Sequence, residues 1–347
     1  MPGDPWMFIA ACMEYTAVVI DKSKSTTDLM IATDATCSGL QINAAVMGDV
    51  NAAKWVNVIG GDEPMDAYTY IAEKAQVLLL DPAWLITNED KGRVTVEMME
   101  AVIPYLSRKV AKPVVMTLFY NAAEYSQKES VKKVLYAALK ETDSEVVPTN
   151  LIWLISQLIT KALRQSLKTE FPKVVGALKE VTTLTKRAVK ESGETYLNWT
   201  TPSGFVVTQH KYVFKDKRVV IPRLGVSVSI RVKEEVIVDG KTLEVANAGG
   251  HAIASVPNFT HALDASLLHL SFESFDKPFS LIHDSVLTRA CDMDEALLSL
   301  KTNFVKMFTE SDPLADFAKD VGIDPALLPT KGDLDVSQVM DSDYFFS

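Results

Sequence analysis

The sequence predicts an α+β fold in which helices dominate the first half of the chain and strands become frequent in the second. Residues 65–80, 95–106 and 151–190 place apolar side chains every three or four positions, which is the spacing of amphipathic helices. Residues 224–232 instead alternate strictly between apolar and polar side chains, as a half-exposed strand does. A chain of 347 residues can bury a sizeable core and form about two subdomains.

The composition is that of an ordinary globular protein, with 48% hydrophobic and 23% charged residues. Cys12, Cys37 and Cys291 form no CxxC pair and no zinc-site spacing, so they indicate free thiols in a reducing compartment. The N-terminus lacks the basic region of a secretory signal, and no stretch approaches the roughly 20 apolar residues that span a bilayer. We therefore expect a soluble, cytoplasmic protein without a membrane partner.

The charge is unevenly distributed along the chain. The net charge is −10, yet residues 151–240 contain 15 Lys and Arg against eight Asp and Glu. A basic segment within an acidic chain favours a localised site for a polyanion. A solvated helical face that carries lysines for solubility explains the same pattern equally well.

The first elements lead to a carboxylate. Residues 6–19 are densely apolar and predict a buried helix, and residues 29–32 predict a strand that ends at Asp34. Small residues from Ala35 to Gly39 follow, and residues 40–48 then predict a short helix. A strand that presents an acidic side chain before such a turn is one way to offer an oxygen ligand to a cation, although helix capping or a turn is the commoner role.

A second carboxylate repeats this situation near the other end of the chain. Residues 278–286 predict an apolar strand that is interrupted by His283, Asp284 and Ser285. A buried carboxylate is costly unless it is paired or bound to metal. If Asp34 and Asp284 meet, two divalent cations would relieve their repulsion and could support phosphoryl chemistry. The alternative is two unrelated turn or capping aspartates.

A cationic segment lies between them. Arg108 and Lys112 are four residues apart and share a helix face, and Tyr120 lies about two turns further on the same side. Such a face suits a triphosphate with an aromatic group beside the base, but it also suits a solvated helix with one partly buried tyrosine. Pro113 implies either that the helix begins near Ala111 or that it kinks.

The remaining candidates are a histidine pair and a hairpin. Residues 257–270 predict a helix that starts after its proline and carries His261 and Asp264; a lone histidine such as His261 or His283 is usually structural. Residues 236–238 lead into Asp239-Gly240, a sequence typical of a tight hairpin turn. The chain has no GxxxxGK[ST], GxGxxG, HExxH or GxSxG motif.

Taken together, several stretches resemble the conserved motifs of single-subunit RNA polymerases of the bacteriophage and mitochondrial type. Their order, spacing and residue types agree, and the similarity is weakest over residues 126–195. The stretches are DATCSGLQ (34–41), RKVAKPVVMTLFY (108–120), PNFTHALDASLLHL (257–270), LIHDS (281–285) and LPTKGDLDVSQVMDSDYFF (328–346).

The resemblance implies a right-hand polymerase fold. Residues 1–60 and 262–347 would form the palm, residues 61–261 would form mostly helical fingers, and a hairpin at about 219–245 would correspond to the promoter-specificity loop. The family's thumb and N-terminal domain would be absent. We therefore expect the catalytic part of a split or truncated polymerase, which works with a second polypeptide that supplies the rest.

The resemblance also implies roles for individual residues. Asp34, Asp284 and the backbone of Ala35 would bind two Mg²⁺ ions. Lys112 would act in catalysis and, with Arg108, contact the nucleoside triphosphate. The remaining assignments are Tyr120 beside the base and sugar, His261 and Gly39 at the ribose 2′-hydroxyl, and Arg218, Arg223, Arg231 and Lys233 on DNA.

These roles imply a DNA template, nascent RNA and NTPs as partners, and the host cytoplasm as the location if a phage encodes the chain. Two alternatives remain open: an inactive remnant that binds nucleic acid, and a related DNA polymerase. Those DNA polymerases carry a bulky Glu where this chain has Gly39, which favours ribonucleotides here. Ala35, Ile42 and Asn121 depart from the family pattern of Gly, His and Gly.

Overall fold

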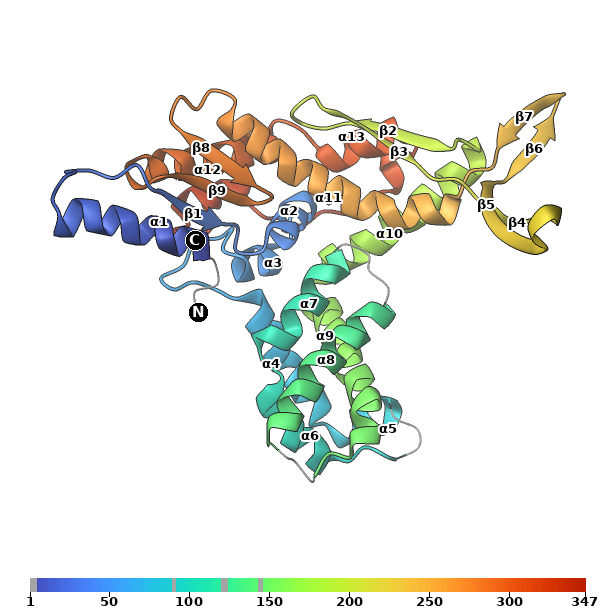
Figure 1. The fold of residues 1–347 in the computed structure, drawn as a ribbon, viewed down its shortest axis with the longest axis horizontal. Helices are drawn as coiled ribbons and strands as arrows, with labels where there is room; N and C mark the ends of the chain where they lie inside the picture. The colour runs from blue at the N-terminus through green and yellow to red at the C-terminus, as the bar shows by residue number, and fades with distance from the viewer. Residues whose placement is uncertain (1–4, 89–91, 120–123, 143–145) are drawn as a thin grey trace.

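The computed structural model describes residues 5–88, 92–119, 124–142 and 146–347 and has the mixed helix and sheet architecture that the sequence predicts (Figure 1). A region centred on a small sheet occupies the upper part of the view, and a bundle of helices extends below it. Hairpins project at the right-hand end. The predicted boundary near residue 61 falls in the loop before the bundle, whereas the boundary at 261–262 falls inside one continuous helix.

The sheet joins the beginning of the chain to its last third. Its three antiparallel strands have the order β1 (Met30–Asp34), β9 (Ser285–Arg289) and β8 (Phe279–Ile282). The prediction of one interrupted strand over residues 278–286 is wrong. His283 and Asp284 form a two-residue turn closed by the Ile282–Ser285 pair, and His283 adopts a left-handed φ of 56° that ends the first strand.

Helices pack around this sheet and along its end. The fully buried α2 (Ser38–Met47) lies against the long α11 (Ala248–Phe272). The predicted start of α11 after Pro257 is wrong, because the proline lies inside the helix and removes one backbone donor without ending it. The other helices of this region are α3 (Val50–Trp55), α12 (Met293–Thr309) and α13 (Pro313–Asp320).

The bundle confirms the predicted helical segments. The cationic helix α7 begins at Arg108 and continues through Pro113, so it does not begin near Ala111. Pro172 separates α9 from α10, as the sequence predicts. The helices are α4 (Ala67–Leu79), α5 (Pro82–Asn88), α6 (Val96–Val102), α7 (Arg108–Phe119), α8 (Glu124–Thr142), α9 (Ile152–Glu170) and the connecting α10 (Pro172–Ser192).

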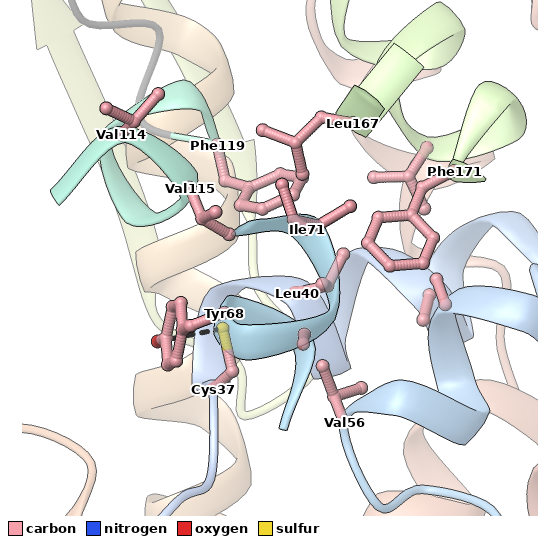
Figure 2. Close-up of a cluster of buried hydrophobic side chains, with 14 of the residues drawn as sticks. Cys37, Leu40, Val56, Tyr68, Ile71, Val114, Val115, Phe119, Leu167 and Phe171 are labelled. Carbon is pink, nitrogen blue, oxygen red and sulfur yellow. Dashed lines mark hydrogen bonds between the residues drawn. The ribbon is translucent and has the colours of Figure 1, made fainter. Parts of the chain in front are cut away.

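One hydrophobic core runs through both regions. Figure 2 shows its middle, where Leu40 of α2 meets Ile71 of α4, Phe119 of α7, and Leu167 and Phe171 at the end of α9. Each fully buried side chain of this size contributes about 1.5–3 kcal/mol relative to an exposed one. This shared core therefore holds the cationic face of α7 in a defined position beside the end of the sheet.

The strand-rich segment forms three separate hairpins. The predicted turn at Asp239-Gly240 is confirmed, and both residues have positive φ values of 50° and 75°. The alternating run that precedes it pairs with an earlier strand instead, so the region is not a single hairpin. The pairs are β2 (Tyr196–Thr200) with β3 (Val206–His210), β4 (Phe214–Ile221) with β5 (Val226–Lys233), and β6 (Glu235–Val238) with β7 (Lys241–Glu244).

The first helix differs most from its prediction. Residues 6–19 were expected to form a buried helix, but α1 (Pro5–Tyr15) and the π-helical turn Thr16–Ile20 contain no buried residue, and Trp6 is 79% exposed. Apolar composition indicates a tendency to be buried without specifying a neighbour, and α1 lies at the outer edge of the molecule (Figure 1). Within the described ranges, no helix is long and apolar enough to cross a membrane.

Candidate active site

Strand pairing brings together the two carboxylates that the sequence singled out. Asp34, the last residue of β1, pairs with Ser285, so it lies beside the adjacent Asp284. Partial desolvation and then repulsion from Asp284 raise the pKa of Asp34. The N–H of Ala35 and the charge of Lys112 act in the opposite direction. The end of the sheet is therefore an acidic site within electrostatic reach of a lysine from the bundle.

These carboxylates are not buried, contrary to the prediction. Asp34 is exposed and Asp284 is half-buried. The reason is their position, since one ends an outer strand and the other lies in the adjoining turn. Apolar strand neighbours indicate a buried strand but do not determine which end of it opens to solvent. An open acidic pair remains accessible to cations and to phosphate groups.

This pair suits Mg²⁺, which binds one or two protein carboxylates and completes its coordination with water and phosphate oxygens. Within the part of the chain that the structure describes, no three or more His, Cys, Asp or Glu side chains are grouped as metal ligands. The like-charge repulsion that raises the pKa of Asp34 is the feature that a bound cation would relieve. The backbone of Ala35 remains a predicted ligand.

The two predicted triphosphate contacts lie on the same face of α7. The Arg108 guanidinium and the Lys112 ammonium group lie 5.0 and 5.7 Å from the centre of the Tyr68 ring, which places one aromatic ring beneath both cations. The charge of Lys112 lowers the pKa of Asp34, so the ammonium group lies within electrostatic reach of the acidic pair. The arrangement could hold a polyphosphate between the bundle and the sheet.

Two residues that the sequence reasoning missed hold this face in place. Asp66 caps α4 by accepting from the N–H of Tyr68 at 3.0 Å, and its other oxygen accepts from Arg108 Nε at 3.0 Å. Since Arg108 is about half exposed, a phosphate could replace this ion pair. The Tyr68 hydroxyl donates to Cys37 Sγ at 3.1 Å, which ties α4 to the turn after Asp34 (Figure 2). Only tertiary packing reveals these contacts.

Helix α11 brings His261 and a third carboxylate to the same place. Desolvation and then the nearby His283 lower the pKa of His261, whereas Asp284 acts in the opposite direction. Burial, followed by repulsion from Asp284 and Asp34, raises the pKa of Asp264 to about 6, although a hydrogen bond from Ser38 opposes the shift. From the sequence alone, Asp264 was assigned no role. Its position three residues after His261 was the available indication that it belongs to the site.

The structure gives less information on the other residues that were predicted to contact the nucleotide. Gly39 is buried in the first turn of α2, and its carbonyl accepts from Asn43 Nδ2 at 2.6 Å. Its contact with a ribose remains a prediction. Ile42, which replaces the family's histidine, is buried in the core. Tyr120 and Asn121 lie outside the described residues.

The C-terminal tail completes the acidic end of the sheet. Ser347 and Asp34 exchange two backbone hydrogen bonds of 3.0 and 3.2 Å. The carbonyl of Tyr344 accepts from Thr36 Oγ1 at 2.7 Å, and that of Phe345 accepts from Gln41 Nε2 at 2.8 Å. The tail thus acts as an additional partner for β1, next to the acidic pair.

The predicted DNA-binding cations lie on and around the β4–β5 hairpin. The strand register places Arg218, Arg231 and Lys233 on one face, while Arg223 lies in the turn at the tip. Lys233 already pairs with Glu244 at 2.6 Å and lies 3.6 Å from the centre of the Tyr212 ring. Arg223 is therefore better placed than Lys233 to meet a ligand.

Comparison with known proteins identifies the family. The model of the DNA-dependent RNA polymerase family matches residues 2–324, and the chain belongs to this family. The resemblance found in the sequence is thereby confirmed.

Several curated relatives are plant proteins named as DNA-directed RNA polymerases. DNA-directed RNA polymerase 3, chloroplastic, of Nicotiana sylvestris is 29% identical over 356 residues, which cover 99% of this chain and 34% of the relative. DNA-directed RNA polymerase 1, mitochondrial, of Arabidopsis thaliana is 26% identical over 355 residues, with coverages of 99% and 34%. DNA-directed RNA polymerase 2A of Nicotiana tabacum is 27% identical over 361 residues and is covered completely.

The chain thus spans about a third of the length of the first two relatives. Their names place those proteins in chloroplasts and mitochondria, so they lend no support to the predicted cytoplasmic location or to a phage origin.

Proposed function

We propose that this chain carries the catalytic centre of a DNA-templated RNA polymerase, which transfers a nucleotide from an NTP to the 3′-end of RNA. The observation that carries the proposal is the β1–β9 register, which joins Asp34 and Asp284 at the end of the sheet facing Lys112. Family membership supports the same reaction. The acidic pair and the cationic face of α7 provide the opposite charges that phosphoryl transfer requires.

In this reaction the RNA 3′-hydroxyl oxygen forms a bond to the α-phosphorus, the bond from that phosphorus to the bridging oxygen breaks, and pyrophosphate leaves. Two Mg²⁺ ions held by Asp34 and Asp284 would stabilise the attacking and leaving oxygens. Arg108 and Lys112 bind the β- and γ-phosphates, and Lys112 neutralises charge that accumulates on the leaving group. Tyr68 keeps both cations on the side that faces the acidic pair.

The sugar is selected at the boundary between α2 and α11. Gly39 leaves room for a 2′-hydroxyl, and His261 recognises that group. A contact of Tyr120 with the base and sugar stays a prediction from the resemblance, because Tyr120 is outside the described residues. The pKa of His261 is lowered by His283 and raised by Asp284, and this proximity supports its position at this edge of the site. The preferred substrate is accordingly a ribonucleotide.

The layout follows a right hand. The sheet and its helices, from residues 1–60 and 262–347, serve as the palm, and residues 61–261 serve as the fingers. The β4–β5 hairpin contacts DNA through Arg218, Arg231 and the tip residue Arg223, with a smaller contribution from Lys233.

The longer relatives extend beyond the matched third, and we propose that promoter-dependent synthesis needs polypeptide in addition to these 347 residues. Promoter-dependent run-off transcription tests this arrangement. We expect transcripts only when the additional polypeptide is present. Robust promoter-dependent transcription by this chain alone would eliminate the need for a partner.

Catalysis itself is tested by extending an RNA primer already annealed to template DNA, which needs no promoter. We expect Asp284→Asn and Asp34→Asn to reduce incorporation at least about 1,000-fold while binding of the primed template survives. Asp294→Asn is the matched control, because it removes the same charge from an exposed position on α12.

Two other outcomes would replace the proposal. If the wild-type chain binds the primed template but incorporates nothing even with the additional polypeptide, the chain is an inactive remnant. If it incorporates deoxynucleotides in preference to ribonucleotides, the chain is a DNA polymerase.

A further inference from the structure

Two polar contacts join α2 to α11 beside the proposed nucleotide site. Ser38 Oγ donates to Asp264 Oδ1 at 2.6 Å, and Asn43 Nδ2 donates to Thr260 Oγ1 at 3.2 Å. Ser38, Asn43 and Thr260 are all buried, with Thr260 only 1% exposed. We call Ser38, Asn43, Thr260 and Asp264 the polar clamp. The four side chains pair across an otherwise largely apolar contact between the two helices.

The polar clamp surrounds the two residues that the proposed function assigns to the ribose. Gly39 follows Ser38 directly, and its carbonyl is held by Asn43 at 2.6 Å. His261 follows Thr260 directly on α11 and precedes Asp264 by about one helical turn. A rotation or sliding of either helix would therefore change the separation between Gly39 and His261.

The chemistry of Asp264 is more specific than helix packing alone requires. Two helices can pack through apolar side chains, and replacement of a buried charged pair by apolar residues is often neutral or stabilising. A short hydrogen bond to a carboxylate is directional, however, and fixes rotation and register as well as distance.

We propose that Asp264, together with Thr260, is a positioning residue that fixes α11 against α2 and thereby sets the spacing between His261 and Gly39 for ribose selection. This inference rests on the proposed function. It extends that function by naming what holds Gly39 and His261, which come from helices far apart in the sequence, at a fixed spacing.

The test compares ribose and deoxyribose substrates. For each variant, kcat and KM are measured for an NTP and for the matching dNTP on the primed template. We expect Asp264→Ala to reduce the ribose preference in kcat/KM about tenfold, mainly through a higher KM for the NTP. Asp264→Asn should stay within about twofold of wild type, because its Oδ1 still accepts from Ser38.

Two further variants separate positioning from general damage. Ser38→Ala removes the donor of the same hydrogen bond and should reproduce the loss of preference. Ser255→Ala, the matched control, removes a buried hydroxyl of α11 that contacts Thr185 of α10 instead of α2, and it should leave the preference unchanged. Equal losses for NTP and dNTP in Asp264→Ala, with an unchanged ratio, would show a merely structural role and overturn the inference.

Equilibrium binding distinguishes this inference from the proposed activity. Fluorescence titration of the Mg²⁺-containing chain on the primed template gives the NTP and dNTP affinities without turnover. If no incorporation occurs but a ribose preference is present in wild type and lost in Asp264→Ala and Ser38→Ala, the proposed activity fails and the inference stands. If wild type binds both sugars equally, the inference is overturned even where incorporation occurs.

Discussion

The hairpins β8–β9 and β4–β5 use the same local structure in opposite surroundings. In the first, β9 lies between β1 and β8, and its Val286 and Thr288 are fully buried, so the turn that carries Asp284 is held on several sides. In the second, β4 is exposed along its whole length and most of β5 is exposed. A hairpin fixes the position of a side chain only when a third element packs against it. This difference fits the catalytic role proposed for the first hairpin and the DNA contact proposed for the second.

Side-chain contacts nevertheless hold two arginines of the exposed β4–β5 hairpin in place. Its register places Val219, Val228 and Ile230 on one face, together with Lys215 and Lys217, and places Arg218 and Arg231 on the other. The hydrogen bond from Arg218 Nε to Ser227 Oγ at 3.0 Å and the position of Arg231 over the Phe214 ring keep the cations on their face. The comparison predicts that changes near β8–β9 alter folding and catalysis together, whereas changes in β4–β5 alter ligand binding alone.

The largest effect should come from removing residues 344–347. This deletion removes the buried Phe345 and Phe346 and both backbone hydrogen bonds to Asp34. Since a buried Phe lost to a small residue costs about 3–5 kcal/mol, we expect the free energy of unfolding to fall by at least about 5 kcal/mol and primer extension to be abolished. Urea unfolding followed by circular dichroism measures the first quantity.

The control for this deletion shortens the exposed hairpin. Replacing residues 219–228 with Asn-Gly joins the paired Arg218 and Ser229 through a tight turn and should change the free energy of unfolding by less than about 1 kcal/mol. A comparable loss of stability in both variants would contradict the distinction between the packed sheet region and the exposed hairpin.

A smaller effect is expected from pH. The pKa of Asp264 is about 6 in the folded chain and near 4 in the unfolded chain, so the folded chain binds more protons between these values. The free energy of unfolding should therefore fall as pH rises through this window, by at most about 3 kcal/mol, and the loss is complete above pH of about 6.

Asp264→Asn cannot titrate, so the stability difference between wild type and this variant isolates the effect. Unfolding in Mg²⁺-free buffer at several pH values should show the difference moving in favour of the variant as pH rises. A difference that does not depend on pH would mean that Asp264 keeps an ordinary pKa.

His283 in the β8–β9 turn and Asp239 in the β6–β7 turn both have positive φ, so the same substitution can be compared in a packed and an exposed hairpin. A β-branched side chain in this conformation costs about 1–2 kcal/mol, so His283→Val should destabilise the chain by that amount and reduce incorporation by moving Asp284. Asp239→Val imposes the same strain on the exposed β6–β7 hairpin and should open it locally while leaving incorporation intact. Equal activity of the two variants would argue against a requirement for a fixed Asp284 turn.

The smallest effects on stability should come from the hairpin cations. Arg223→Ala should leave the free energy of unfolding within about 0.5 kcal/mol and lower the salt slope of DNA binding by about 1. Lys233→Ala should change DNA binding less, because its ammonium group is already paired with Glu244. Fluorescence anisotropy with duplex DNA across a range of salt concentrations measures both, and a larger effect of Lys233→Ala would reverse the assignment.

Much of the secondary structure could be predicted from local sequence. The helices of the bundle follow from apolar spacing, and the Asp239-Gly240 turn follows from residues that tolerate positive φ. Local rules failed where a residue type permits two outcomes. Pro257 can begin a helix or lie within one, and His283 gave no indication that it would adopt the left-handed conformation that divides an apolar run into two strands.

By itself, the sequence determined the residue types of the site: two aspartates, two cations one helical turn apart and a histidine, in an order that defines the family. Only the tertiary structure decided that Asp34 and Asp284 adjoin at the solvent-exposed end of the sheet, that Tyr68 lies beneath both cations, and that Asp264 joins α11 to α2. The physical reason is that these contacts depend on strand register and helix packing between distant segments. Residue spacing along one segment specifies which side chains share a face, but it does not specify which other segment that face contacts.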